Sequence, residues 1–378
     1  MGERTRRGPS MFDVARVAGV SHQTVSRVLN AHPNVREVTR TRVLSAIDEL
    51  GYRPNRAART LVTGRDRVLG VVAPGSTLFG PVSLLAAFEE QAVNAGFGVS
   101  VVRIRDLDGA SVREAVDRHL DGQVSGIVVI APVAPVAAAL DELPRTVPLV
   151  TVDGDPARPG AMATVDQVEG GRVATRRLLE AGHRTVWHIS GPPDWFDAAG
   201  RAAGWEAELR AAGCEVPPVV PGDWSPDAGY RAGQFLGRMP EVTAVFAAND
   251  AMATGLLHAL HERGRAVPGD ISVVGFDDVP SSAHLIPPLT TIRPDFEAVA
   301  RAALDLLVAG ADGVGGINGA DNTGGANGTG GANNTGGANG TGGTGDTDPV
   351  PVASGEAVAH RGVVPVLVDR DSVGPPPG

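Results

Sequence analysis

The 378-residue sequence contains no lysine, a single cysteine (Cys214) and few aromatic side chains, which make up 4% of its residues. With one cysteine the chain cannot form an internal disulfide, as is usual for proteins of a reducing compartment. It also lacks any run of 18 apolar residues, which argues against a membrane-spanning helix. The basic start MGERTRRGPS leads into a polar helical pattern, so we expect no signal peptide and a cytoplasmic, nucleoid-associated protein.

The positive charge, carried by arginine alone, is distributed unevenly along the chain. Residues 1–64 hold eleven arginines and five acidic residues, a net charge of +6, whereas the whole chain carries −10. The residues after position 64 therefore carry −16. A basic segment joined to an acidic body predicts that only the basic segment meets a polyanion such as DNA.

Short helices are predicted in the basic segment. Ser10 and Asp13 have the spacing of a capping box at the start of the first helix. Gly19 predicts a turn, after which Ser21 can cap a second helix. A third helix is indicated by apolar residues at spacings of four and three. The predicted helices span residues 11–18, 21–30 and 37–50.

The first two helices have the spacing of a helix-turn-helix. Ala15, Gly19 and Val25 provide the small residue, the turn glycine and the branched apolar residue that this motif needs. A second helix that buries Val25 and Val28 leaves polar side chains outside, where a surface helix ordinarily carries Glu, Lys or Ala. Glutamine can pair bidentately with adenine and arginine with guanine. The candidate DNA contacts on this helix are Ser21, His22, Gln23, Thr24, Ser26, Arg27 and Asn30.

From Val68 onward, apolar runs of four to seven residues alternate with amphipathic helical stretches. Examples of the runs are RVLGVVAP, VSGIVVIAP and DISVVGFDD. Buried apolar strands joined by crossover helices predict parallel sheets that are covered on both faces. About ten such strands favour two sheets over one. The late segment GVVPVLVDRDS is predicted to add one further strand.

A repeat of Gly, Ala, Asn and Thr, with the sequence GGANGTGGANNTGGANGTGGTGDTD at its centre, occupies about residues 311–348. It lacks large apolar side chains, so its burial cannot offset the entropy lost on ordering. We expect a disordered insertion. The chain then ends in VGPPPG without heptads, which favours a homodimer over a tetramer held by a terminal coiled coil.

Several segments resemble the LacI/GalR family of bacterial transcription regulators, among them MFDVARVAGVSHQTVSRVLN, LGYRPNRAARTL, VFAANDAMATG and IPPLTTIRPDF. The resemblance covers nearly the whole chain except the repeat and the two tails. It implies an α/β protein with an all-α helix-turn-helix headpiece over residues 1–52 and a hinge over 53–64. It also implies a two-lobed, periplasmic-binding-protein-like body with parallel sheets over 65–378.

By this resemblance the headpiece and hinge bind double-stranded operator DNA. His22, Gln23 and Arg27 match the family's base-reading positions. The family's hinge helix orders on specific DNA and enters the minor groove, where Leu61 would wedge between base pairs. Alone, a helix of one to two turns is marginal in water. The supporting or backbone-contact positions are Ser10, Ser26, Asn30 and Thr39, and the hinge contacts are Asn55, Ala58, Arg59 and Leu61.

Polar side chains end several predicted strands of the body, namely Asp153, Asn249 and Asp277. Open parallel sheets bind ligands beyond the carboxyl ends of their strands, and carboxylates and amides there can pair with sugar hydroxyls. Trp224 offers a flat apolar face for a pyranose, and Arg201 offers a planar fork of donors. The resemblance matches these positions, with Phe296, to inducer contacts. The predicted effector-binding residues, with Phe79 and Asp197 as wall positions, are Phe79, Asp153, Asp197, Arg201, Trp224, Asn249, Asp277 and Phe296.

Two departures from the family pattern bear on specificity. His22 stands where the lactose-responsive branch has a tyrosine, which puts the same operator in doubt. Asp197 stands where that branch has a serine, which puts the same ligand in doubt. Structural roles also stay open for some site residues, because an aspartate at a strand end can simply cap a helix and Trp224 can pack between lobes. Asp278 is expected to be such a cap.

The main hypothesis is a homodimeric repressor that a carbohydrate releases from its operator. A purine-type, corepressor-dependent regulator remains an alternative, as does a solute-binding protein without gene control. A sugar-processing enzyme is the third class, but the sequence has no nucleophile elbow, Walker loop or acid/base pair. His183 and His188 have no partner His or Cys at metal-ligand spacing, and we expect neither catalysis nor a cofactor or metal.

Overall fold

The computed structural model describes residues 9–29, 34–52, 67–143, 146–315 and 359–377, with the side chains of 311–315 left out. The chain divides into two compact units, Met1–Asp66 and Arg67–Gly378. The predicted hinge and most of the glycine-rich repeat lie outside the described residues, as do Asn30, Asn55, Ala58, Arg59 and Leu61.

The first unit contains the three predicted helices, α1 (Met11–Ala18), α2 (His22–Leu29) and α3 (Glu37–Leu50). The capping box is present, because the Ser10 amide donates to Asp13 Oδ2 at 3.0 Å and the Asp13 amide donates to Ser10 Oγ at 3.4 Å. Gly19 ends α1 with φ 62°, a left-handed conformation that favours glycine. The apolar faces of the helices meet in one small core built around Val14, Val25, Val28, Val43, Ala46 and Tyr52.

The second unit contains two six-stranded sheets. The strands of the first are all parallel and lie in the order β11 (His360–Val363), β5 (Ala161–Val165), β4 (Leu149–Val152), β3 (Gly126–Ile130), β1 (Val68–Pro74) and β2 (Gly98–Ile104). The second has the order β12 (Val366–Val368), β10 (Thr290–Arg293), β9 (Ser272–Phe276), β8 (Ala244–Ala247), β6 (Trp187–Ser190) and β7 (Val220–Pro221). Here β12 alone is antiparallel to its neighbour.

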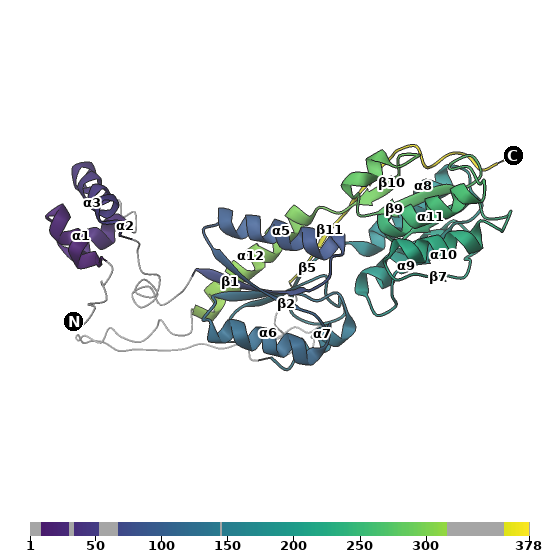
Figure 1. Cartoon of the computed structure of the whole chain (residues 1–378). Helices are drawn as coiled ribbons and strands as arrows, with labels where there is room; N and C mark the ends of the chain where they lie inside the picture. Colours follow the sequence, from purple (N-terminus) through teal and green to yellow (C-terminus); the bar gives the residue numbers. More distant parts are fainter. Residues whose placement is uncertain (1–8, 30–33, 53–66, 144–145, 316–358, 378) are drawn as a thin grey trace, which may run out of the picture. The chain divides into compact units, whose positions relative to one another are not determined.

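Helices cover both faces of each sheet, as the apolar strand pattern predicts (Figure 1). The first sheet and its helices form the first lobe. One face carries α5 (Phe79–Asn94) and α12 (Phe296–Gly315), and the other carries α6 (Gly109–Asp121) and α7 (Ala134–Leu140).

The second sheet and its helices form the second lobe, which has the same layered arrangement. One face carries α10 (Pro226–Leu236) and α11 (Asp250–Glu262), and the other carries α8 (Gln167–Glu180) and α9 (Phe196–Ala211). A 3₁₀ turn, Pro280–His284, follows β9. These layers confirm the predicted two-lobed α/β body with parallel sheets.

The chain passes between the two lobes three times, after β5, after β10 and after β11. The last passage corrects the prediction of a single strand in GVVPVLVDRDS, since the segment forms β11 and β12 in different sheets. Pro365 lies between them, where the missing backbone N–H cannot continue a ladder. A second correction concerns the repeat, because α12 continues to Gly315, past the predicted start near residue 311.

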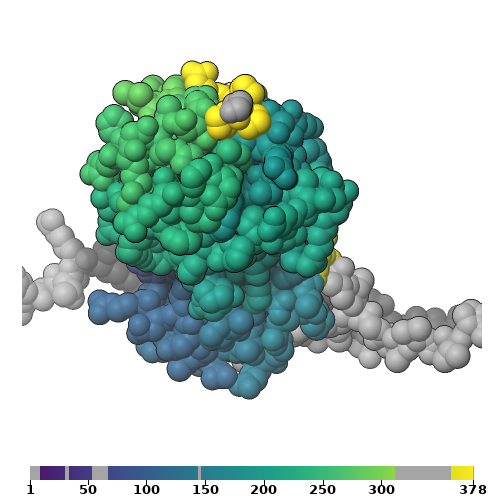
Figure 2. All heavy atoms as spheres, turned by 90° about the vertical axis from the view of Figure 1, so that its right-hand side faces the viewer, coloured from purple at the N-terminus to yellow at the C-terminus, as the bar shows by residue number. Residues whose placement is uncertain are grey.

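The end of the described chain belongs to the second lobe. The Val273 amide of β9 donates to the carbonyl of Ser372 at 2.9 Å, and the Gly374 amide donates to Ser272 Oγ at 3.0 Å. Ser372 is fully buried. Figure 2 shows part of this C-terminal segment, in yellow, at the surface of the lobe. Throughout the described ranges, no helix is both long and apolar enough to cross a membrane.

Candidate DNA-reading helix and effector site

The polar side chains of α2 lie on the face opposite its buried valines. Val25 and Val28 are buried in the headpiece core, whereas His22, Gln23 and Arg27 are exposed. These three exposed residues are called the DNA-reading face below. Their charge and donor groups are those that pair with base edges and phosphates.

The other predicted residues of this region have more local roles. Ser21 Oγ accepts a hydrogen bond from the Thr24 amide at 3.2 Å, so it caps α2 as predicted. The hydroxyls of Ser21 and Thr24 also lie 2.9 Å apart. Ser26 and Thr39 are half-buried, and Ser10 caps α1. These positions can support the helix at the DNA backbone, and all of them except Ser21 are less exposed than the DNA-reading face.

Phe12 on α1 was missed by the sequence analysis. Its ring is 71% exposed and its centroid lies 5.3 Å from that of His22, with 30° between the ring planes. An exposed aromatic ring therefore packs beside the first residue of the DNA-reading face. The available signal was a large apolar residue on the outward side of the predicted first helix.

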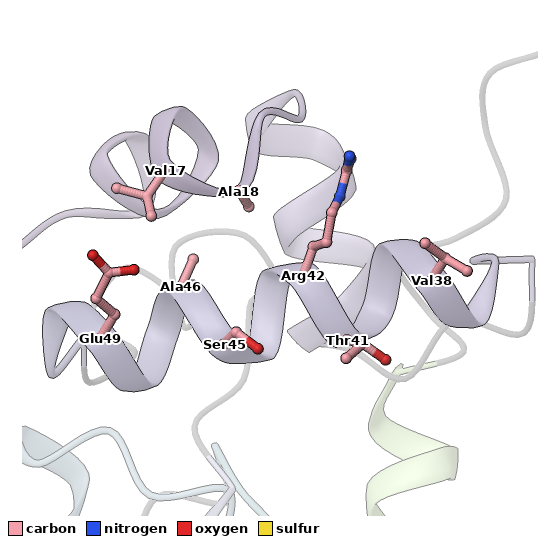
Figure 3. A pocket seen from close by; sticks show the side chains of 8 residues that line it. All are labelled: Val17, Ala18, Val38, Thr41, Arg42, Ser45, Ala46 and Glu49. Carbon is pink, nitrogen blue, oxygen red and sulfur yellow. The ribbon is translucent and has the colours of Figure 1, made fainter.

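An open groove of about 470 Å³ lies between α1 and α3. Figure 3 shows Arg42, Ala46 and Glu49 of α3 on the side that faces Val17 and Ala18 of α1. None of the three residues of the DNA-reading face is among those that line it. The groove is thus a separate feature of the headpiece.

In the body, Arg201 of α9 is the centre of a buried polar group. Its guanidinium carbon lies 3.6 Å from the ring centroid of Phe276 and 5.4 Å from that of Trp224. Nε donates to Gln167 Oε1 at 2.9 Å, and Nη1 donates to the carbonyl of Ala248 at 2.5 Å. Arg201 is 5% exposed, so these contacts hold the fork in one orientation.

Two predicted aspartates face this guanidinium at longer distances. Asp197 Oδ2 lies 3.8 Å from Arg201 Nη2, and Asp277 Oδ1 lies 3.8 Å from Arg201 Nη1. Their side chains are 16% and 10% exposed, respectively. The structure therefore brings together residues that lie far apart in the sequence, as the effector-site prediction requires.

Burial raises the pKa of all three predicted aspartates. Burial and then the charge of Asp197 raise the pKa of Asp153 to about 7, against a hydrogen bond of 3.1 Å from Thr164 Oγ1. Burial raises the pKa of Asp277 to about 8 although Arg201 opposes the shift, and burial also raises the pKa of Asp197. Asp153 follows β4 of the first lobe and Asp197 lies on α9 of the second lobe, so charged groups from both lobes meet at one site. Asp153, Asp197, Arg201, Trp224 and Asp277 are called the Arg201 site below.

The backbone is left-handed at several of these positions. The φ angles are 52° at Asp153, 70° at Trp224 and 107° at Asp277. Only two further non-glycine residues of the described chain, Gln123 and Asp278, share this feature. Such conformations are costly for L-residues and concentrate at functional sites, where the surrounding structure maintains them.

Asn249 caps a helix and supports the backbone of Trp224, which are structural roles. Its Oδ1 accepts from the Met252 amide at 2.8 Å and caps α11. Its Nδ2 donates to the carbonyl of Trp224 at 3.1 Å and so supports the Trp224 backbone. The indole Nε1 of Trp224 is buried and has no hydrogen-bond partner within the described structure.

The remaining predicted aromatic residues form a pair on the first lobe. The ring centroids of Phe79 and Phe296 lie 6.2 Å apart with 63° between their planes, at the starts of α5 and α12. Leu78, directly before α5, packs against the core of the second lobe. The start of α5 therefore lies at the boundary between the lobes.

Asp278 is not the helix cap that the sequence predicted. Its carboxylate accepts from Arg293 Nε at 2.6 Å and from Arg370 Nη2 at 2.6 Å. Arg370 follows β12, so this aspartate ties the end of the described chain to the segment directly after β9. A local pattern cannot indicate a partner 92 positions away.

Gln167, Phe276 and Trp195 also belong to the site and were missed. Gln167 and Phe276 contact Arg201 directly, and Trp195 packs edge-on against Trp224 with centroids 5.8 Å apart. Trp195 also contacts the cores of both lobes. Phe276 ends β9 and Gln167 begins the helix after β5, so the strand-end rule could have found both.

Two family descriptions match parts of the chain. Residues 10–55 match the bacterial regulatory proteins of the lacI family, and residues 175–319 match the periplasmic binding protein-like domain. The lactose operon repressor of Escherichia coli (strain K12) is 34% identical over 303 residues, which cover 79% of this chain and 84% of that protein. The HTH-type transcriptional regulator CelR of Thermobifida fusca is 37% identical over 319 residues, which cover 80% and 92%.

Solved structures of the same kind are similar to this chain. A crystal structure of the lac repressor dimer bound to operator and the anti-inducer ONPF has a TM-score of 0.78 at 29% identity, with 97% of this chain and 100% of that chain covered. A complex of the transcriptional regulator CelR with cellobiose has a TM-score of 0.62 at 30% identity, with 96% and 99% covered.

Proposed function

Because the chain belongs to the lacI family of bacterial regulatory proteins, we propose that it is a sequence-specific DNA-binding transcriptional regulator controlled by a carbohydrate. The observation that carries the DNA-binding part is the DNA-reading face. His22, Gln23 and Arg27 project from α2 while its valines hold the helix on the headpiece core. The relatives named above are regulators, which supports a role other than catalysis.

The Arg201 site supports a small polar effector in the body. It combines a fixed guanidinium, carboxylates and an indole with an unpartnered N–H, next to the boundary between the lobes. Carbohydrates offer hydroxyl groups for the polar side chains and C–H faces for the indole. The complex of CelR with cellobiose is consistent with a ligand of this class.

The proposed mechanism is a shift between two arrangements of the body. A ligand shifts the body toward one arrangement only as far as it binds that arrangement more tightly than the other. Because ligand and DNA binding are coupled through this shift, the ligand changes the affinity for DNA by the same factor by which DNA changes the affinity for the ligand. In the proposed cycle a homodimer represses from a pseudo-palindromic operator in the cytoplasm. The sugar favours the arrangement in which residues 53–64 cannot engage the minor groove.

The test begins with an operator. The full chain selects duplexes from a random pool, and the enriched sequence is then titrated with and without mono- and disaccharides, including β-galactosides and cellobiose. We expect a two-fold symmetric site whose affinity falls when a sugar is present. Selection of no sequence would contradict a DNA-binding regulator.

The direction of the ligand effect separates induction from corepression. A sugar that weakens operator binding supports induction. A purine that tightens operator binding would instead support the corepressor-dependent alternative, because differential affinity would then favour the DNA-bound arrangement. A Trp224→Ala variant should lose the ligand response but retain DNA binding, which checks that the response comes from the Arg201 site.

A further inference from the structure

We propose that the effector carries a positive charge, and that the Arg201 site binds an amino sugar through Asp197, Asp277 and Asp153. This inference rests on the proposed function, because it identifies the chemical class of that same effector. It begins from the charges that the two lobes bring together.

With its carboxyl groups ionised, the site would hold more buried negative than positive charge. Three aspartates, Asp153, Asp197 and Asp277, share one guanidinium, that of Arg201. A buried carboxylate is stable only when it is paired or hydrogen-bonded, or when it takes up a proton. Consistent with this, the pKa of Asp153 rises to about 7 and that of Asp277 to about 8.

Arg201 leaves much of this charge unmatched. Two of its donors are used by neutral acceptors, the Gln167 side chain and the Ala248 carbonyl. Its nearest approaches to Asp197 and Asp277 are 3.8 Å, which is beyond hydrogen-bond length. Within the described part of the chain, no hydrogen bond reaches the carboxylate of either aspartate. Two nearly buried carboxylates therefore lack donors.

The other titratable groups around the site do not restore the balance. Asp250, which raises the pKa of Asp277, already accepts hydrogen bonds from Val279, Ser282 and Thr291. His188, on strand β6 of the same sheet, has its pKa lowered to about 4 by burial and is neutral near pH 7. Within the described residues no side chain supplies the positive charge that would keep these carboxyl groups ionised, so they either hold protons or bind a cation.

The geometry points to an organic ammonium group rather than a metal ion. An ammonium group has three N–H donors and a full charge, which suits carboxylates that lack donors. Trp224 needs a hydrogen-bond acceptor, because its buried Nε1 is a donor that has no acceptor within the described structure. A ligand that carries both an amino and a hydroxyl group meets both needs. Among the described side chains, no three of His, Cys, Asp and Glu lie in positions that could hold a metal ion.

The experiment compares matched sugars on the full chain. Each set has a neutral sugar, its amine and its N-acetyl derivative. The first set is glucose, glucosamine and N-acetylglucosamine, and the second is galactose, galactosamine and N-acetylgalactosamine. The third is cellobiose with the corresponding disaccharides that carry two amino groups or two N-acetylamino groups. Affinity is measured by calorimetry at about pH 7, where alkyl amines are protonated. Repeating each titration in two buffers of different ionisation enthalpy gives the number of protons that are released or taken up on binding.

We expect one amine to bind about tenfold or more tightly than both its uncharged partners, because the charges meet in a desolvated site. We also expect net proton release, since a bound cation lowers the pKa of carboxylates that are partly protonated in the free protein. The Asp197→Ser and Asp197→Asn variants should still bind neutral sugars, but they should no longer bind the amine more tightly than its uncharged partners. Glu206→Gln, on the exposed side of the same helix α9, is the matched control and should keep it.

Other outcomes overturn the inference in distinguishable ways. If a neutral sugar binds as tightly as its amine, the effector is an uncharged carbohydrate, and the proposed function stands without this inference. If Ca²⁺ or Mg²⁺ alone stabilises the protein and Asp197→Asn abolishes the effect, the cation is a metal. If no sugar binds while operator binding persists, the carbohydrate part of the proposed function fails together with the inference.

Discussion

The guanidinium carbon of Arg201 lies 3.6 Å from the centroid of the Phe276 ring. Arg201 comes from α9 and Phe276 is the last residue of β9, so this contact joins a helix on one face of the second sheet to the carboxyl end of a central strand. The ring contact and the hydrogen bonds to Gln167 and Ala248 together hold the guanidinium in place. The fork is thereby oriented before any ligand arrives, which reduces the entropy lost on binding.

Replacement of Arg201 by lysine should be costly although it preserves the charge. A lysine cannot stack its head group on Phe276 and also donate to both Gln167 and Ala248. We expect a loss of about 1–3 kcal/mol in the free energy of unfolding of the body and the loss of sugar binding. Urea denaturation and calorimetry measure the two effects. Arg210→Lys, exposed on the same helix, is the control and should change neither.

The pH dependence of stability should contain a contribution from Asp277. Its folded pKa of about 8 lies above the unfolded value of about 3.9, so the folded state binds more protons between these values. Its contribution is therefore complete below about pH 4 and is lost as the pH rises through about 8. We expect Asp277→Asn to make stability fall less steeply over this window. Equal slopes for the two proteins would contradict the assigned shift.

Loss of a base-reading side chain should affect specific DNA more than unrelated DNA. We expect Gln23→Ala and Arg27→Ala to weaken binding to the selected operator by about 1–3 kcal/mol each. Because Gln23 is uncharged, its removal should leave binding to unrelated duplexes unchanged. Gel-shift titrations with both duplexes test this, with Arg210→Ala in the body as the control. A uniform loss on both duplexes for Gln23→Ala would contradict its assignment to a base.

Phe12→Ala should change specificity with little change in stability. The ring is 71% exposed, so its removal should alter the free energy of unfolding by about 0.5 kcal/mol or less. It also frees the imidazole of His22, which the ring contacts at 5.3 Å between centroids. Sequencing of selected duplexes should then show relaxed preference at one position of each half-site. Val38→Ala, another exposed apolar residue of the headpiece, should leave the preference intact.

Leu61→Ala tests the minor-groove wedge that the sequence predicts. If the side chain enters a base step, its loss should reduce specific affinity and DNA bending while the salt-dependent, non-specific component remains. Binding at several salt concentrations and a bending assay measure these components separately. An operator that is bound as tightly and bent as strongly by the variant would rule out the wedge.

Local patterns in the sequence predicted the elements whose formation depends on near neighbours. The Ser10–Asp13 capping box, the turn at Gly19 and the buried side of α2 follow from contacts within a few residues. The apolar runs indicated buried parallel strands, and the polar residues after β4 and β9 indicated the Arg201 site. The predicted helices and parallel strands are confirmed because side-chain periodicity is a property of the chain itself, whereas the role of the strand-end residues stays a prediction.

Only the tertiary structure decided which of these residues meet. The division of GVVPVLVDRDS between two sheets, the ion pair of Asp278 with Arg370 and the packing of Trp195 on both lobes depend on the passages of the chain between the lobes. The ion pair of Asp278 with Arg293 depends on the pairing of β9 with β10 inside the second lobe. Burial, and after it the charge of Asp197 from the other lobe, raises the pKa of Asp153. The two partners of Asp278 lie 15 and 92 positions away, and the pKa shift of Asp153 arises chiefly from burial, which exists only in the folded chain.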